Sequence, residues 1–67
     1  MKNIFEKNER GALIMGNQYL RTKLAAEVSG MSVTSLDKIT EIEMKKYQNK
    51  KYYCESDITK YLNKQFN

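Results

Sequence analysis

The chain has 67 residues, which is enough for one domain with a small core, since a chain of this length buries roughly 60% of the surface that its unfolded form exposes. Its 12 basic and 8 acidic residues leave a formal net charge of +4, which favours an acidic partner without identifying one. With no histidine and a single cysteine, the composition excludes an intramolecular disulfide and argues against a zinc site or a histidine general base.

We therefore expect a protein that is not an enzyme and that requires no metal and no cofactor. No apolar stretch approaches the ~20 residues that a membrane-spanning helix needs. The lone Cys54 suits a reducing compartment. These features predict a soluble, cytoplasmic protein without a membrane partner.

Residues 1–18 mix charged residues and asparagine with two glycines and one apolar cluster. Glu6 and Arg10 are spaced as an i,i+4 pair, which predicts a short helix over residues 3–10. We interpret residues 1–18 as an N-terminal arm or a short helix, with disorder as the alternative, separate from a winged-helix domain formed by residues 19–67.

A regular apolar pattern then predicts two helices joined by a turn, which is a helix-turn-helix. Thr22 is a candidate N-cap of the first helix, and Gly30 lies where a helix needs a left-handed closing residue. Ser32 is a natural N-cap for the second helix, which cannot extend far beyond residue 42. The apolar positions are Leu20, Leu24, Val28 and Met31 in the first helix and Val33, Leu36 and Ile39 in the second.

A β-hairpin is predicted next, with strands over about residues 43–47 and 51–54, joined by Gln48, Asn49 and Lys50. Asn49 adopts a positive φ more cheaply than most residues, as a tight hairpin requires. The segment from Glu55 to Phe66 predicts a third helix, because its apolar residues recur on one face. Those residues are Ile58, Tyr61, Leu62 and Phe66.

Together these elements predict an α+β, mostly helical fold: a winged helix-turn-helix with a two-stranded wing and a C-terminal helix. The ten residues 44–53 contain four lysines and no acid, so the wing would present a basic tip. Basic tips suit nucleic-acid backbones, although an ordinary solvated face is the alternative. The predicted DNA-binding wing residues are Lys45, Lys46, Gln48, Asn49, Lys50 and Lys51.

In this interpretation the lysines neutralise phosphates, while Gln48 and Asn49 contact base edges or sugars in the minor groove. Four phosphate contacts would make log K fall with log salt at a slope of about −3.6, from ~0.9 per contact. Tyr47, Tyr52 and Tyr53 suggest base stacking, but we favour amphipathic packing, with Tyr53 in the core and Tyr52 pointing outward.

The helix-turn-helix supplies a second set of candidate DNA contacts. Arg21 and Lys23 precede and open the first helix, an end that approaches the DNA backbone in this motif, with plain surface charge as the alternative. Short hydroxyls on the second helix bind a phosphate or a base, or serve as helix caps. The candidates there are Ser32, Thr34, Ser35 and Lys38.

Two segments carry a family resemblance. The first segment runs from Tyr19 to Leu36 and contains the Ala-rich helix Leu24-Ala25-Ala26-Glu27-Val28 and the turn Gly30-Met31-Ser32. The second runs from Lys50 to Leu62. It contains a basic wing, the aromatic pair Tyr52-Tyr53, and Asp57-Ile58 ahead of Tyr61-Leu62. In this order and spacing they resemble the small winged-helix, helix-turn-helix DNA-binding domains of the excisionase and MerR-like group, over residues 19–63.

The resemblance implies a bacterial or bacteriophage-encoded protein that binds double-stranded DNA. It implies either an excisionase-like architectural factor in the recombination of a phage or mobile element, with a recombinase or integrase as a further partner, or a small transcriptional regulator. A monomer that assembles cooperatively on DNA is the expected state.

An alternative function follows from a departure from the family pattern. Many members of the group carry arginines at the positions of Thr34 and Asp37, and Asp37, Glu41 and Glu43 make this region acidic. The alternative is a winged-helix protein repurposed to bind and inhibit a host protein through its acidic second helix.

Overall fold

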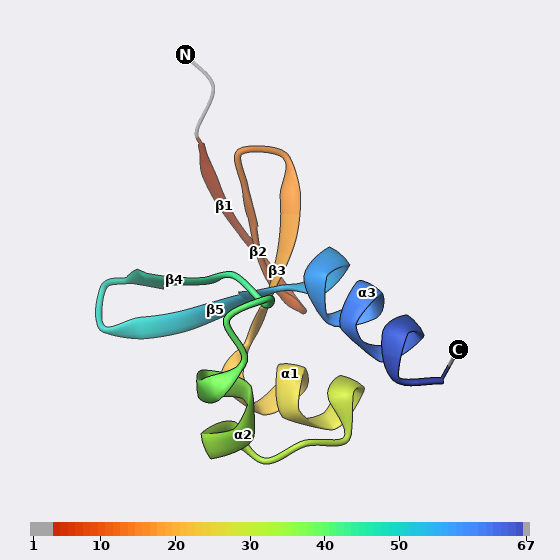
Figure 1. Ribbon diagram of the computed structural model, residues 1–67. Coiled ribbons are helices and arrows are strands. Elements are labelled where there is room, and N and C mark those ends of the chain that lie inside the picture. The colour runs from red at the N-terminus through yellow and green to blue at the C-terminus, as the bar shows by residue number, and fades with distance from the viewer. Residues whose placement is uncertain (1–3, 67) are drawn as a thin grey trace.

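The structure, a computed structural model, describes residues 4–66 (Figure 1). Three strands come first, two short helices follow, and a hairpin leads into the C-terminal helix. The elements are β1 (Phe5–Asn8), β2 (Gly11–Ile14), β3 (Asn17–Arg21), α1 (Thr22–Ser29), α2 (Val33–Lys38), β4 (Met44–Tyr47), β5 (Lys50–Cys54) and α3 (Glu55–Phe66).

The five strands form one antiparallel sheet in the order β1-β2-β3-β5-β4. The sheet curves into a half-barrel, so the domain is α+β but is not mostly helical. The predicted winged helix with a two-stranded wing is therefore wrong as an architecture. The hairpin β4–β5 is one end of a larger sheet, because β5 pairs with β3 and thereby joins the meander β1–β2–β3.

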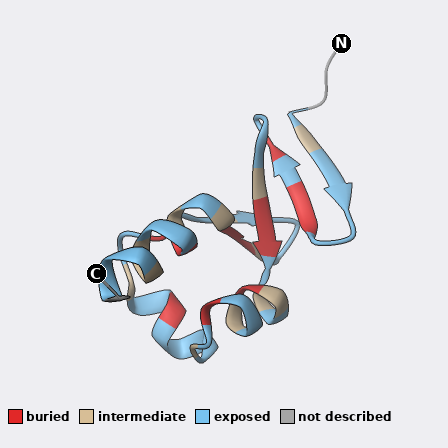
Figure 2. Ribbon diagram, turned by 90° about the vertical axis from the view of Figure 1, so that its right-hand side faces the viewer, coloured by how far each residue is buried: buried red, intermediate tan, exposed pale blue. Residues whose placement is uncertain are grey.

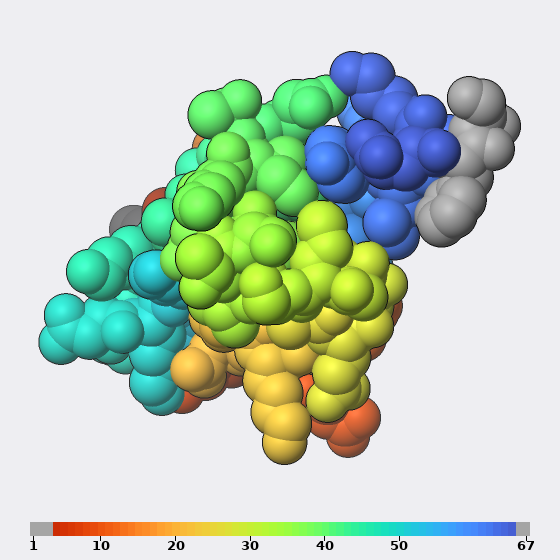
Figure 3. All heavy atoms as spheres, turned by 60° about the horizontal axis from the view of Figure 1, so that its bottom comes forward, coloured from red at the N-terminus to blue at the C-terminus, as the bar shows by residue number. Residues whose placement is uncertain are grey.

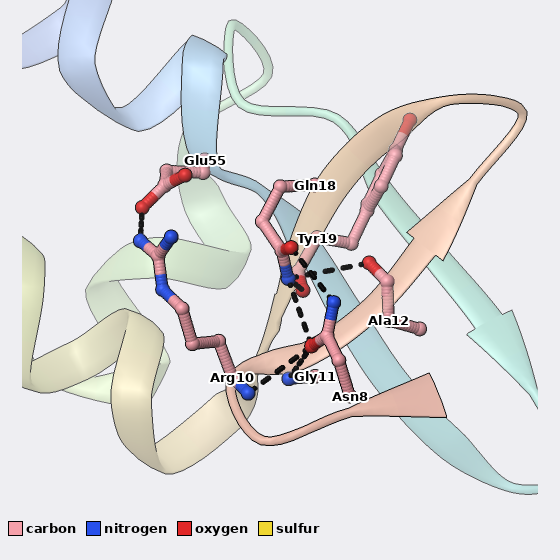
Figure 4. A network of polar contacts seen from close by, with 7 residues as sticks. All are labelled: Asn8, Arg10, Gly11, Ala12, Gln18, Tyr19 and Glu55. Carbon is pink, nitrogen blue, oxygen red and sulfur yellow. Dashed lines mark hydrogen bonds and ion pairs between the residues drawn. The ribbon is translucent and has the colours of Figure 1, made fainter. Parts of the chain in front are cut away.

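The predicted helix over residues 3–10 is wrong, because β1 and the turn to β2 occupy the described part of that range; residue 3 lies outside the described residues. The Asn8 side chain makes the turn: its Oδ1 accepts hydrogen bonds from the backbone N–H groups of Arg10 (3.1 Å) and Gly11 (2.9 Å). Asn8 also exchanges hydrogen bonds with Gln18 of β3 (Figure 4). This network stabilises the meander at its turn.

The two tight hairpins share one turn geometry. Met15 and Gly16 connect β2 to β3 with φ values of 51° and 84°, and Gln48 and Asn49 connect β4 to β5 with values of 50° and 65°. Two successive positive φ angles match the twist of paired strands. The positive φ predicted for Asn49 is confirmed, whereas Lys50, predicted in the loop, begins β5.

Two buried clusters lie on opposite faces of the central strands β3 and β5. The first packs between the sheet and the helices and consists of Leu20, Ala25, Leu36, Ile42, Tyr53 and Ile58. The second lies on the concave face of the sheet and consists of Ala12, Ile14, Tyr19, Tyr52 and Cys54, with Phe5 against it. Figure 2 shows the longest buried segments on strands of the sheet and shorter buried stretches along the helices.

The predicted helix pair forms, with most of its predicted caps. Gly30 closes α1 in the left-handed conformation (φ 71°), and its N–H donates to the Ala26 carbonyl at 2.9 Å. Ser32 is the N-cap of α2, and its hydroxyl accepts a hydrogen bond from the backbone N–H three residues later. The N-cap of α1 is Arg21 rather than the predicted Thr22, and the Arg21 side chain makes no capping hydrogen bond.

The predicted C-terminal helix is confirmed as α3, and its first turn holds two other parts of the chain. Asp57 Oδ2 accepts a hydrogen bond from the backbone N–H of Glu43 at 3.0 Å, just before β4. Glu55 forms an ion pair with Arg10, which lies in the β1–β2 turn (Figure 4). Arg10 therefore contacts α3 instead of forming the helical pair expected with Glu6.

Candidate nucleic-acid interface

The candidate interface is centred on the hairpin β4–β5, which projects from the molecule beside α2 (Figure 3, cyan beside green). The strand register places Lys46 opposite Lys51 and Lys45 opposite Tyr52. Because side chains alternate between the faces of a strand, Lys46 and Lys51 share the helix-side face, whereas Lys45 and Lys50 share the concave face. The four lysines therefore surround the hairpin rather than form one row.

Two of the four lysines form ion pairs within the molecule. Lys45 Nζ lies 2.9 Å from Glu43 Oε2, and Lys51 Nζ lies 3.1 Å from Asp37 Oδ2. Counting these two carboxylates against the four lysines lowers the local charge from +4 to +2. The charge available to a polyanion is thus smaller than the number of lysines indicates. Exposed pairs of this kind contribute ~0–1 kcal/mol, so a phosphate can compete for either lysine.

The other two lysines are exposed. Lys46 and Lys50 take part in none of the ion pairs found in the part of the chain that the structure describes. Gln48 and Asn49 are exposed between them at the tip of the hairpin. Within the predicted wing, this tip is the part whose charge is not already balanced by a neighbouring carboxylate.

Asp37 connects α2 to the base of the hairpin. The Tyr53 hydroxyl donates a hydrogen bond of 2.6 Å to Asp37 Oδ1, while Lys51 binds the other carboxylate oxygen. The Tyr53 hydrogen bond and the Lys51 ammonium lower the pKa of Asp37. Burial of the Tyr53 hydroxyl and the adjacent Asp37 carboxylate raise the pKa of Tyr53 to about 12. The Asp37 carboxylate therefore holds α2 beside the hairpin.

The two basic candidates near the start of α1 differ in their surroundings. The Arg21 guanidinium lies 5.5 Å from the centre of the Tyr52 ring, a cation–π contact worth ~0.5–1 kcal/mol at an exposed site. Arg21 also pairs with Tyr52 in the strand register, which brings it to the concave side of β5. Lys23 is exposed on α1. Contact of either residue with a DNA backbone stays a prediction.

The hydroxyl candidates on α2 divide into two groups. Ser32 Oγ accepts the Ser35 N–H at 3.2 Å and donates to Ser35 Oγ at 3.1 Å, so Ser32 serves as the cap and Ser35 is its partner. Contact of either hydroxyl with DNA stays a prediction. Thr34 and Lys38 are exposed on the same helix. Their contact with bases or phosphates stays a prediction.

The three hairpin tyrosines occupy different environments. Tyr53 is fully buried against the helices, as predicted. The outward direction predicted for Tyr52 is wrong, because this ring is 1% exposed on the concave face, in the cluster that strands β2 and β3 help to form. Tyr47 remains 43% exposed. Of these three residues, only Tyr47 presents a ring to solvent.

Sequence reasoning missed an aromatic cluster that joins the two edge strands. Phe5 of β1 stacks on Tyr47 of β4 with ring centroids 4.1 Å apart and planes 20° apart, and its edge meets Tyr52 at 5.3 Å. The sheet curves far enough for its opposite edges to meet at this point. The alternation of Ala12 and Ile14 and the turn residue Gly16 were signals of strands in this region, but neither indicated contact with β4.

No protein-family model, curated protein or solved structure was found to match this chain. In residues 4–66, no helix has the length and apolar character that crossing a membrane requires. No group of three or more His, Cys, Asp and Glu side chains in the described part of the chain is arranged to hold a metal ion.

Proposed function

We propose that this protein binds double-stranded DNA through the hairpin β4–β5, with modest sequence specificity. The observation that carries the proposal is the exposed tip, where Lys46 and Lys50 lie on opposite faces of a projecting hairpin without an internal ion pair in the described residues. A phosphate backbone is the polyanion that such a tip suits best, because charge neutralisation there releases counterions.

The adjoining residues extend this surface. Lys45 and Lys51 join it when a phosphate displaces Glu43 or Asp37, and α2 contributes the exposed Lys38. Within this proposal the chain acts as an excisionase-like architectural factor or a transcriptional regulator of a phage or mobile element. Copies bound at adjacent sites would bend DNA for a recombinase.

The salt dependence of binding measures how many lysines take part. Contacts by Lys46 and Lys50 alone give a slope of log K against log salt of about −1.8, whereas release of Lys45 and Lys51 from their ion pairs moves it toward about −3.6. Fluorescence anisotropy with a labelled duplex at several salt concentrations measures this slope.

The variant K46A/K50A tests the site. We expect weaker binding and a slope that is smaller by about 2, with little change in thermal unfolding, because both side chains are exposed. The matched control K7A/K60A removes the same charge from exposed lysines on β1 and α3. Equal losses of affinity in both variants would assign binding to net charge and contradict the proposed site.

A second candidate function is inhibition of a host protein. The specific observation in its favour is the internal pairing of Lys45 and Lys51, which leaves half of the basic residues of the hairpin balanced by carboxylates. If no duplex binding is detected even at ~50 mM salt, where phosphate contacts are strongest, the DNA proposal fails. A protein partner recovered by pull-down and lost in an α2 variant such as T34R would then support inhibition.

A further inference from the structure

A pocket of about 330 Å³ opens on the concave side of the sheet, between the edge strands β1 and β4. This volume is at the lower end of the range for small-molecule sites, so it suits one compact group rather than an extended ligand. The lining residues come from the start of the chain, β1, β2 and β4, and they are Ile4, Phe5, Ile14, Lys45, Lys46 and Tyr47.

The walls of this pocket combine aromatic rings and ammonium groups. Phe5 and Tyr47 form a stacked pair at 4.1 Å, and Tyr47 is 43% exposed, so part of its ring is available to a further planar group. Lys46 contributes a positive charge with no ion pair among the described residues, whereas Lys45 is paired with Glu43. None of the described residues that line the pocket is acidic. An occupant therefore has an apolar, planar part and a negative charge close to it.

Two exposed lysines flank Tyr47 on the hairpin, and only Lys46 also lines the pocket. Lys46 precedes Tyr47 in β4, and Lys50 lies directly opposite it in β5. A single strand of nucleic acid presents the complementary arrangement, in which each planar base lies between phosphates. An acidic peptide would satisfy the lysines but would leave the stacked aromatic wall without a matching planar partner.

We propose that this pocket binds an unpaired nucleobase of a nucleic-acid strand, whose flanking phosphates contact Lys46 and Lys50. This inference rests on the proposed function and deepens it. The protein should prefer DNA that offers an unstacked base, such as a gap or a distorted junction, over a fully paired duplex.

The test compares a labelled duplex with the same duplex carrying a short single-stranded gap. Base–aromatic stacking predicts roughly tenfold tighter binding of the gapped probe. A 2-aminopurine placed in the gap should lose fluorescence when the protein binds, because its base stacks on the pocket wall.

Two variants at one position separate stacking from folding. Y47L should abolish the preference for the gap while its affinity for the paired duplex stays within about twofold, and Y47F should keep the preference because it keeps the ring. Thermal unfolding of both variants checks that the fold is intact. K46A/K50A should weaken binding of both probes.

The outcomes distinguish the two proposals. Equal affinity for the gapped and paired probes, or a gap preference that survives in Y47L, would overturn the pocket proposal while the duplex-binding proposal stands. Binding of neither probe would overturn both. Self-association that Y47L abolishes, measured by sedimentation, would make a second copy of the chain the occupant and would likewise overturn the nucleobase proposal.

Discussion

The carboxylate of Asp37 receives two hydrogen bonds from one strand, because Tyr53 and Lys51 lie on the same face of β5. The same contacts relieve a repulsion within the hairpin, where Lys51 faces Lys46 across the strands. The negative charge of Asp37 repels a phosphate. Nevertheless, the carboxylate orients α2 and neutralises the ammonium group of Lys51. Asp37 therefore has a structural role whether or not the surface binds DNA.

This role predicts a pH-dependent loss of stability. The pKa of Asp37 is lower in the folded protein than the ~3.9 expected in the unfolded chain, so the ionised carboxylate contributes stability above about pH 4. That contribution is lost as the pH falls through the folded pKa. D37N should lower the free energy of unfolding at pH 7 by about 1 kcal/mol. The stability of this variant should also fall less steeply with decreasing pH than that of the unmodified protein.

Thermal unfolding of both proteins from neutral to acidic pH measures the effect. E27Q provides a matched control, since Glu27 is exposed on α1 and takes part in no ion pair found in residues 4–66. If D37N and E27Q respond alike to acid, the Tyr53 and Lys51 contacts do not stabilise the fold in the way described.

At the scale of the elements, local signals specified two of the three predicted caps and the hairpin β4–β5, but they did not specify the strands β1, β2 and β3. Gly30 and Ser32 act at the ends of α1 and α2 as predicted, because a cap depends on residues within one turn. The spacing of Glu6 and Arg10 favours a helix over residues 3–10, yet residues 5–8 form the strand β1. Its strand geometry comes from pairing with β2 and from Phe5 packing on rings of β4 and β5, and such distant contacts override local propensity.

Two glycine substitutions separate close packing from backbone conformation. A Cβ at Gly11 (φ 153°) would lie 2.3 Å from the Tyr19 carbonyl oxygen, whereas a Cβ at Gly30 (φ 71°) would meet no atom within 4 Å. G30A should therefore cost about 1 kcal/mol from backbone strain alone. G11A adds a clash with the backbone of β3 and should cost about 3 kcal/mol or more.

Urea unfolding of the two variants measures the difference. The expected order, with G11A much less stable than G30A, follows from the tight pairing of β2 against β3. Equal stability of the two variants would mean that the close approach at Gly11 relaxes at little cost.

For the molecule as a whole, the decisive feature is that β5 is buried on both faces. Tyr53 packs against the helices and Tyr52 packs in the concave cluster. The alternation rule placed Tyr52 outside because it assumed a hairpin with one face in solvent. The N-terminal meander β1–β2–β3 covers that face of β5, so the hairpin is part of the sheet and not a separate two-stranded wing.

This arrangement predicts that the meander is required for folding. A chain that begins at Met15 lacks β1 and β2 and would expose the buried face of Tyr19 and Tyr52. Since small domains have only ~5–15 kcal/mol of net stability, we expect it to lose its cooperative unfolding transition. Circular dichroism of the shortened and the full chain during heating tests this expectation. A transition that is preserved at the same temperature would show that the helices and the hairpin fold without the meander.

The sequence by itself determined the features that depend on near neighbours: the caps at Gly30 and Ser32, the positive φ at Asn49, and the helix after residue 54. It also identified the basic hairpin. Only the tertiary structure decided that this hairpin belongs to a five-stranded sheet, that two of its lysines are ion-paired, and that Phe5 meets Tyr47. These contacts join residues that are far apart in the chain. They depend on the curvature of the sheet and on burial of both of its faces, and no local sequence pattern specifies either feature.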